Sequence, residues 1–113
     1  MQAQIKAKAI ALAVDDEPDI LELIKMTLER MDIIVHTATN IEAAKKQLAC
    51  NAYDLCLTDM RLPDGDGLKI IQELKETSSN PEIIIMTGQG DPDGVEIAIK
   101  NGAWCYLEKS SIA

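Results

Sequence analysis

The sequence has few basic residues, and this shortage limits what the chain can bind. Lys and Arg number 11 against 19 Asp and Glu, which gives a formal net charge of −8. A chain of this charge repels the phosphate backbone of nucleic acids and anionic lipid surfaces. We therefore expect no direct binding to nucleic acid or to membranes by this chain.

Paired cysteine motifs are also lacking. Cys50, Cys56 and Cys105 are odd in number and show no Cys-x-x-Cys spacing. Cys56 and Cys105 fall inside apolar runs, where cysteine behaves as a small hydrophobic residue. This pattern favours a reducing cytoplasm and gives the thiols no role in metal binding.

Two longer motifs are absent as well. The apolar run 10–14 follows Lys6 and Lys8 and ends at Asp15. It is too short to span a membrane, so we interpret this region as a tail followed by a strand. No Gly-x-x-x-x-Gly-Lys-Ser/Thr loop occurs, which disfavours nucleotide hydrolysis.

The remaining composition is that of one globular α/β domain over residues 1–113. The chain has 113 residues, 47% of them hydrophobic, and a mean hydropathy of −0.02. Apolar runs of strand length alternate with amphipathic segments of helix length, which is typical of a parallel sheet built from βαβ units. The expected strands are 10–14, 33–37, 53–58, 82–86 and 104–108.

Four helices are expected between these strands. The first spans 18–31, the second carries Ile41, Ala44 and Leu48 on one face, the third spans 68–77, and the fourth has Val95, Ala98 and Ile99 on its inner face. Capping-box spacing to Glu42 makes Thr39 the expected N-cap of the second helix, and Asp91 is the expected N-cap of the fourth. Only four residues follow Lys109, so a helix after the last strand is missing.

Polar side chains stand where four of the five strands end. Asp15 and Asp16 follow the first strand, Asp59 the third, Thr87 the fourth and Lys109 the fifth. The carboxyl ends of parallel strands share one sheet edge, which is where open α/β sheets place their sites. Converging carboxylates repel one another unless a cation lies among them, and Mg²⁺ favours carboxylate and phosphate oxygens. The sequence therefore predicts a magnesium site that handles phosphate.

Four motifs around these residues resemble the receiver domain of bacterial two-component response regulators. They lie in the family's order at residues 14–18, 59–67, 86–88 and 102–109, so the resemblance covers about residues 9–109. It implies the CheY-like, flavodoxin-like doubly wound fold, with a five-stranded parallel sheet in the order 2-1-3-4-5. It also implies a sensor histidine kinase or phosphotransfer protein as the phosphoryl donor.

The resemblance assigns a role to each residue at the sheet edge. Asp59 is the implied phosphoacceptor, Asp16 a direct Mg²⁺ ligand and Asp15 a ligand through water, and Asp59 and the backbone carbonyl of Arg61 complete the coordination. The roles implied for the other residues are charge compensation by Lys109 and switching by Thr87 and Tyr106. Arg61 and Gln89 flank the path of an attacking water and are expected to tune the lifetime of the phosphorylated form.

Two other functions compete with a phosphorylation-dependent switch. A phosphorylation-independent interaction module could retain the acidic site as a relic, and Ser110, in place of the family's usual proline, favours that reading. A phosphohydrolase would need a second Asp two residues after the nucleophile, where this chain has Arg61. We therefore expect a regulatory phosphoacceptor and not an enzyme, with activity limited to self-phosphorylation and slow self-dephosphorylation.

The remaining expectations concern packing and output. His36 and Trp104 are assigned to structure. Without a fifth helix, apolar side chains of the last two strands on the face of the first helix should lack a cover, so we expect sequence or an output domain beyond Ala113, or a homodimer, to supply it. The run 59–63 resembles that of receivers attached to transcriptional activators, which favours transcription regulation as the output.

Overall fold

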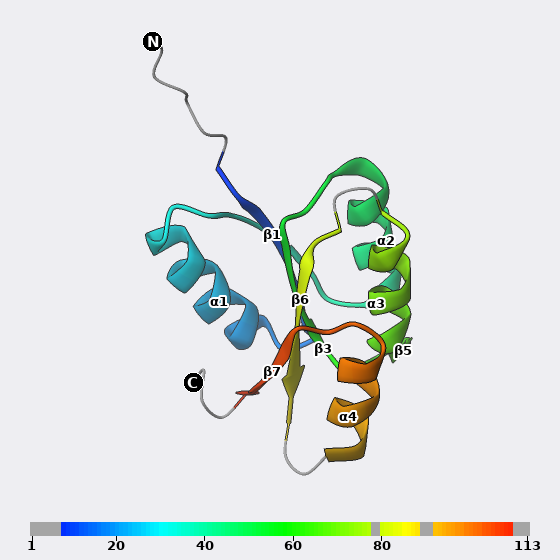
Figure 1. The fold of residues 1–113 in the computed structure, drawn as a ribbon. Helices are drawn as coiled ribbons and strands as arrows, with labels where there is room; N and C mark the ends of the chain where they lie inside the picture. The colour runs from blue at the N-terminus through cyan, green and yellow to red at the C-terminus, as the bar shows by residue number, and fades with distance from the viewer. Residues whose placement is uncertain (1–7, 78–79, 89–91, 110–113) are drawn as a thin grey trace.

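Five parallel strands form one sheet with helices on both faces (Figure 1). The structure is a computed structural model that describes residues 8–77, 80–88 and 92–109. The strands are β1 (Ile10–Val14), β2 (Ile34–Ala38), β3 (Leu55–Asp59), β6 (Glu82–Thr87) and β7 (Cys105–Glu108), in the order β2-β1-β3-β6-β7. Without the short hairpin strands β4 and β5 this is the order 2-1-3-4-5, so the predicted topology is confirmed.

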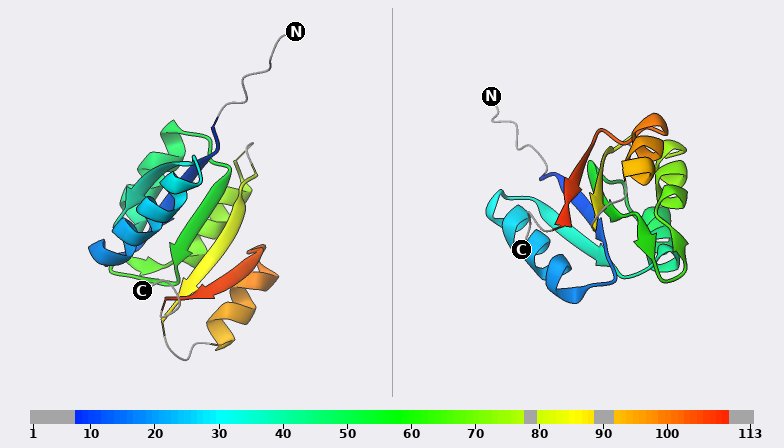
Figure 2. Two further views of the ribbon diagram at one scale, coloured as in Figure 1. Left: turned by 90° about the vertical axis from the view of Figure 1, so that its left-hand side faces the viewer. Right: turned by 90° about the horizontal axis from the view of Figure 1, so that it is seen from below.

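The helices divide unevenly between the two faces. Helix α1 (Pro18–Arg30) covers one face, and α2 (Ile41–Cys50), α3 (Leu68–Lys75) and α4 (Pro92–Lys100) cover the other (Figures 1 and 2). The unbroken apolar run of β6 places side chains on both faces of the sheet. Ile83 and Ile85 belong to the core cluster under α2 and α3, and Met86 belongs to the cluster under α1. None of the described helices is long and apolar enough to cross a membrane.

Several expected element boundaries are wrong by a residue or two. The N-cap of α2 is Asn40, not Thr39, because the backbone stays extended through Asn40, whose side chain accepts a hydrogen bond from the Ala43 N–H at 2.7 Å. Helix α3 ends at Lys75, and the Thr77 hydroxyl donates back to the Leu74 carbonyl at 2.7 Å. Asp91, the expected cap of α4, lies outside the described residues.

Three apolar residues of the predicted helices and strands are exposed. Trp104 is 69% exposed because it immediately precedes β7, the edge strand of the sheet. Met31, the C-cap of α1, is 64% exposed where the chain turns toward β2. Ile99 is 40% exposed, whereas its neighbour Ala98 is fully buried in the core cluster under α4.

His36 has the structural role that we expected. Its Nδ1 lies 2.8 Å from the hydroxyl oxygen of Tyr53, which precedes β3 and is almost fully buried. The Tyr53 hydroxyl donates in turn to Gln47 Oε1 at 3.3 Å. The edge strand β2 is thus tied to α2 through a polar contact that sequence spacing does not reveal.

The face under α1 is better covered than expected. Met86 is fully buried in a cluster with Ile20 and Ile24 of α1, so the expectation that it lacks a cover is wrong. Ile84 packs partly buried against the same cluster, and Leu107, the neighbour of Met86 in β7, is also partly buried. Helix α1 itself supplies more of this cover than the sequence indicates.

A short hairpin connects β3 to α3. Its antiparallel strands are β4 (Arg61–Leu62) and β5 (Gly65–Asp66). At its tip the Asp64 carboxylate accepts hydrogen bonds from the Ile41 and Glu42 N–H groups, at 2.8 and 3.1 Å. The hairpin is therefore fastened to the N-terminus of α2, where unpaired N–H groups attract a carboxylate.

Replacing Asp64 by Ala should destabilise the protein at neutral pH, because the first N–H groups of α2 lose their acceptor. The hydrogen bond from Ile41 holds the pKa of Asp64 below its ordinary value, so this stabilisation is present above the unfolded-state pKa and is lost as the pH falls through the folded one. Urea unfolding of Asp64→Ala and wild type should differ at pH 7 and converge in acid. The same change at exposed Glu76 is the control, and an equal loss there would contradict this role.

Candidate functional site

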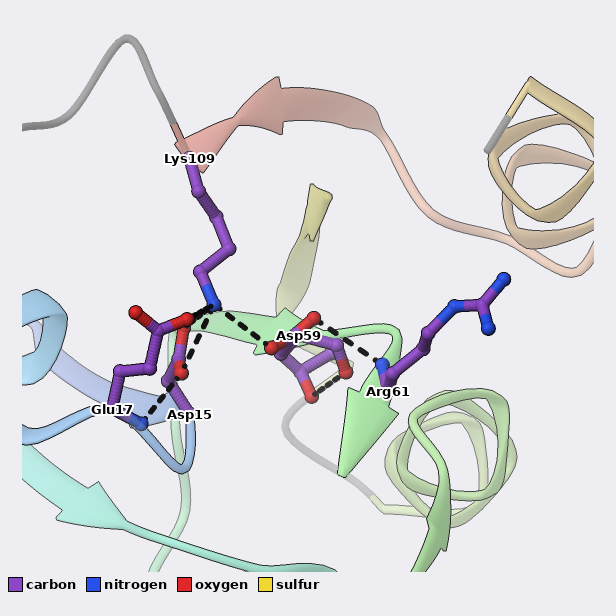
Figure 3. Close-up of polar contacts among 6 residues, drawn as sticks. Asp15, Glu17, Asp59, Arg61 and Lys109 are labelled. Carbon is purple, nitrogen blue, oxygen red and sulfur yellow. Dashed lines mark hydrogen bonds and ion pairs between the residues drawn. The ribbon is translucent and has the colours of Figure 1, made fainter. Parts of the chain in front are cut away.

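The polar residues predicted to meet at one sheet edge lie there in the structure. Asp15 directly follows β1, Asp59 ends β3, Thr87 ends β6, and all three are buried. Lys109 directly follows β7, and Figure 3 shows its side chain reaching across the edge toward Asp15 and Asp59. The parallel register makes this convergence unavoidable, since Asp59 pairs with Met86 and the next residue, Thr87, pairs with Glu108.

The Lys109 ammonium is shared by three carboxylates. Its Nζ lies 3.1 Å from Asp59 Oδ2 and 3.1 Å from Asp15 Oδ2, and it also contacts Glu17 Oε1 closely. Figure 3 shows these contacts as dashed lines. Glu17 is the residue that our sequence reasoning missed; its place in the acidic run 15–17 at a strand end was the available signal.

Burial and ion pairing act against each other at this cluster. Burial raises the pKa of Asp15 above its ordinary value, against the lowering effects of the Glu17 N–H and the Lys109 ammonium. Burial alone would lower the pKa of Lys109, but its hydrogen bonds to three carboxylates, Glu17 first, outweigh burial and raise it. Lys109 is therefore charged at neutral pH and compensates the buried carboxylates.

The hairpin after β3 packs closely against Asp59. The Arg61 N–H donates to Asp59 Oδ1 at 3.2 Å, and the Gly67 N–H donates to the Met60 carbonyl at 2.8 Å. A Cβ at Gly67 would lie 2.2 Å from the carbonyl oxygen of Asp59, so only glycine permits this approach. The loop thereby holds the Asp59 carboxylate from the side opposite Lys109.

The side chain of Arg61 does not cover Asp59. In Figure 3 it extends away from the carboxylate. It lines an open cleft between the hairpin and α4, together with Leu62, Asp66 and Ile97. The expected influence of Arg61 on the lifetime of a phosphorylated form stays a prediction, and Gln89 lies outside the described residues.

The residues at this edge fit a hard divalent cation. Oxygen atoms of Asp15, Asp16 and Glu17 lie within 4.8 Å of one another, and carboxylate oxygens are the ligands that Mg²⁺ prefers. Asp15 Oδ2 is buried without a hydrogen-bond partner, apart from its ion pair with Lys109. The predicted ligand Asp59 stands across the Lys109 ammonium from this group, and not within it.

The predicted switch residues lie on neighbouring strands. Thr87 is 5% exposed at the end of β6, and Tyr106, in the middle of β7, is 52% exposed. Tyr106 pairs in register with Ile85, so its side chain stands on the α4 face of the sheet. Trp104 and Ile97 are also exposed in this region. Thr87 thus lies between the acidic edge and a surface with exposed apolar side chains.

Comparison with known proteins places this geometry in a family. The model of the response regulator receiver domain matches residues 11–112. The chain is 44% identical over 99 residues to the response regulator protein PilR of Pseudomonas aeruginosa, and 36% identical over 98 residues to the transcriptional regulatory protein SrrA of Staphylococcus aureus. These alignments cover 88% and 87% of this chain, but only 22% of PilR and 40% of SrrA.

Solved structures agree with the sequence comparison. A response regulator receiver domain protein from Clostridium thermocellum superposes with a TM-score of 0.81 at 38% identity, over 89% of this chain and 82% of that one. The beryllofluoride-activated NtrC4 receiver domain dimer gives a TM-score of 0.81 at 35% identity, over 88% and 83%. The chain is a response regulator receiver domain, a regulatory module of two-component signalling.

Removing the shared ammonium should destabilise the fold. Lys109→Met leaves the buried Asp15 carboxylate without its counter-ion, and breaking a buried pair in this way costs about 3 kcal/mol. Adding Asp15→Asn should restore part of the loss, because it removes the unpaired charge. Urea unfolding at pH 7 without metal measures both. As a control, Lys100→Met breaks only an exposed pair with Glu96 and should cost less than about 0.5 kcal/mol; equal losses at both lysines would contradict the buried pair.

Proposed function

We propose that this receiver domain is a phosphorylation-dependent switch whose phosphoacceptor is Asp59. The donor is a sensor histidine kinase or a phosphotransfer protein, and the reaction needs Mg²⁺. The observation that carries the proposal is the contact of the buried Asp59 carboxylate with Lys109 at the edge where Asp15 and Asp16 also lie.

The proposed chemistry uses the carboxylate of Asp59 as a nucleophile. One of its oxygens forms a bond to phosphorus while the phosphorus–nitrogen bond to the donor histidine breaks, which leaves an acyl phosphate on Asp59. Lys109 stays within reach of the new phosphoryl oxygens, because it already contacts Asp59 Oδ2. The N–H of Arg61 orients the other carboxylate oxygen.

The acidic residues are the proposed ligands of the cation. Asp15, Asp16, Asp59 and the backbone carbonyl of Arg61 would hold Mg²⁺, which supplies positive charge to the incoming phosphoryl group. Asp15 is the best-fixed of these ligands, since it is fully buried and accepts a hydrogen bond from the Glu17 N–H at 2.9 Å.

The phosphorylated state is read on the α4 and β7 side. In this proposal the Thr87 hydroxyl turns toward a phosphoryl oxygen, and Tyr106 moves inward into the space that Thr87 leaves. Both residues lie on adjacent strands, and Tyr106 begins half exposed. The exposed side chains around it, Trp104 and Ile97, would then present a changed surface to an output partner.

The proposed output is transcription regulation in the cytoplasm. PilR is a response regulator and SrrA a transcriptional regulatory protein, and this chain spans about a fifth and two fifths of their lengths. We infer that an output domain or a second receiver is the partner. The dimer formed by the beryllofluoride-activated NtrC4 receiver domain supports a homodimer as one form of that partnership. Apart from accepting and slowly releasing the phosphoryl group, the domain carries out no reaction in this proposal.

Incubation with Mg²⁺ and phosphoramidate, a small phosphodonor, should add a single phosphoryl group to the wild-type chain, detected by intact mass. Asp59→Asn should abolish the adduct, because the amide is not a nucleophile for this step. Asp19→Asn removes the same charge from an exposed position on α1 and should leave the yield unchanged. An undiminished adduct in Asp59→Asn would rule out Asp59 as the acceptor, and no adduct on the wild type would favour the phosphorylation-independent module.

Mg²⁺ should stabilise the folded protein, because it binds a carboxylate cluster that exists only in the native state. At a metal concentration 100 times its Kd the gain is about 2.7 kcal/mol. Asp16→Asn should melt at a higher temperature than wild type without metal, since one repelling charge is gone, and should respond little to Mg²⁺. Thermal melts with Mg²⁺ or with NaCl at equal ionic strength decide this. An unchanged melting temperature of the wild type in millimolar Mg²⁺ would contradict the proposed metal site.

A further inference from the structure

Of the three carboxylates that share Lys109, Glu17 alone is neither the proposed phosphoacceptor nor one of the proposed Mg²⁺ ligands, although one of its oxygens lies within 4.8 Å of oxygens of Asp15 and Asp16. Asp59, the last residue of β3, and Asp15, directly after β1, are both buried. The Glu17 side chain is 58% exposed and meets Lys109 from the solvent side of the cluster. It can therefore move with the ammonium, which the two buried carboxylates cannot do.

The backbone of Glu17 is held at both ends of the residue. Its N–H donates to Asp15 Oδ1 at 2.9 Å, and its carbonyl accepts from the Leu21 N–H at 3.2 Å. Glu17 is the N-cap residue of α1, yet its side chain forms no capping hydrogen bond to the helix. The carboxylate contacts Lys109 instead. The backbone of Glu17 is thus held by hydrogen bonds, while its side chain stays exposed to solvent.

A divalent cation beside Asp15 and Asp59 changes the balance at this cluster. Lys109 now contacts both of these carboxylates, and two cations that share the same oxygens repel each other. The ammonium must then give up part of its contact with the buried pair. Glu17 is the acceptor that remains for it within the described part of the site.

We propose that Glu17 is a positioning residue that retains the Lys109 ammonium at the rim of the site while a divalent cation occupies the carboxylates. The inference rests on the proposed function, because it presupposes Mg²⁺ binding at this edge. Glu17 lets the cation and the ammonium be present together. Lys109 is then at hand for the oxygens of the phosphoryl group that reaches Asp59.

The test is a double-mutant cycle on Mg²⁺ affinity, measured by calorimetric titration of the whole chain without phosphodonor. Glu17→Gln should weaken Mg²⁺ binding about tenfold, because Lys109 then competes for the two buried carboxylates. In a Lys109→Gln background the same change should matter less than about twofold, since the competitor is gone. Glu22→Gln, which removes one charge from an exposed position on α1, should have little effect.

A second experiment keeps Lys109 and tests whether the length of the side chain at position 17 matters. Glu17→Asp preserves the charge but is one methylene shorter, so it should still bind Mg²⁺ more weakly than wild type. Full rescue by Asp, or an undiminished Glu17→Gln effect in the Lys109→Gln background, would show that Glu17 acts only as a charge or a ligand and would overturn the inference. Because this experiment retains the lysine, it stays decisive if the Lys109 variants fold poorly.

The two proposals fail in different ways. If wild type binds Mg²⁺ and Glu17→Gln binds it equally well, the role of Glu17 is wrong and the proposed phosphoacceptor site stands. If wild type itself binds no Mg²⁺, both the proposed metal site and the proposed role of Glu17 are wrong.

Discussion

The structure of the acidic edge depends on one ammonium group. Lys109 follows the last strand, and its partners Asp15 and Asp59 lie directly after the first strand and at the end of the third, so its side chain links the end of the edge strand β7 to two strands of the sheet that do not pair with it. Without that cation the edge would hold buried carboxylates and no compensating charge. The ion pairs that compensate these buried carboxylates also hold the ends of three strands together, so the site is part of what stabilises the sheet.

This arrangement also couples the site to the loop beside it. The hairpin that carries Arg61 is tied to Asp59 on one side and, through Asp64, to the N-terminus of α2 on the other. A change at Asp59 therefore acts on two neighbours, the lysine after β7 and the hairpin. Both are held by polar contacts that a new charge on Asp59 would rearrange.

Most of the architecture could be predicted from the sequence, and the parts that could not share a physical cause. The parallel sheet and the meeting of Asp15, Asp59 and Lys109 follow from apolar periodicity and from the geometry of parallel strands, whereas the strand order was implied by the resemblance to receiver domains. The contacts of Asp64 with the N-terminus of α2 and of Glu17 with Lys109 join residues far apart in sequence, which local sequence patterns do not reveal. Trp104 was misplaced because hydrophobicity alone does not reveal that a residue lies at the end of an edge strand.

The exposure of Trp104 has a spectroscopic consequence. It is the only tryptophan of the chain, and most of its surface faces solvent beside β7. Its indole emission therefore reports the polarity of the surface around β7 rather than that of the core. A protein or a second copy that covers this surface would shift the emission to shorter wavelength without any label, whereas unfolding, which leaves the indole in water, would change it little. The chain thus carries a built-in optical reporter of docking on the side where its signal is proposed to be read.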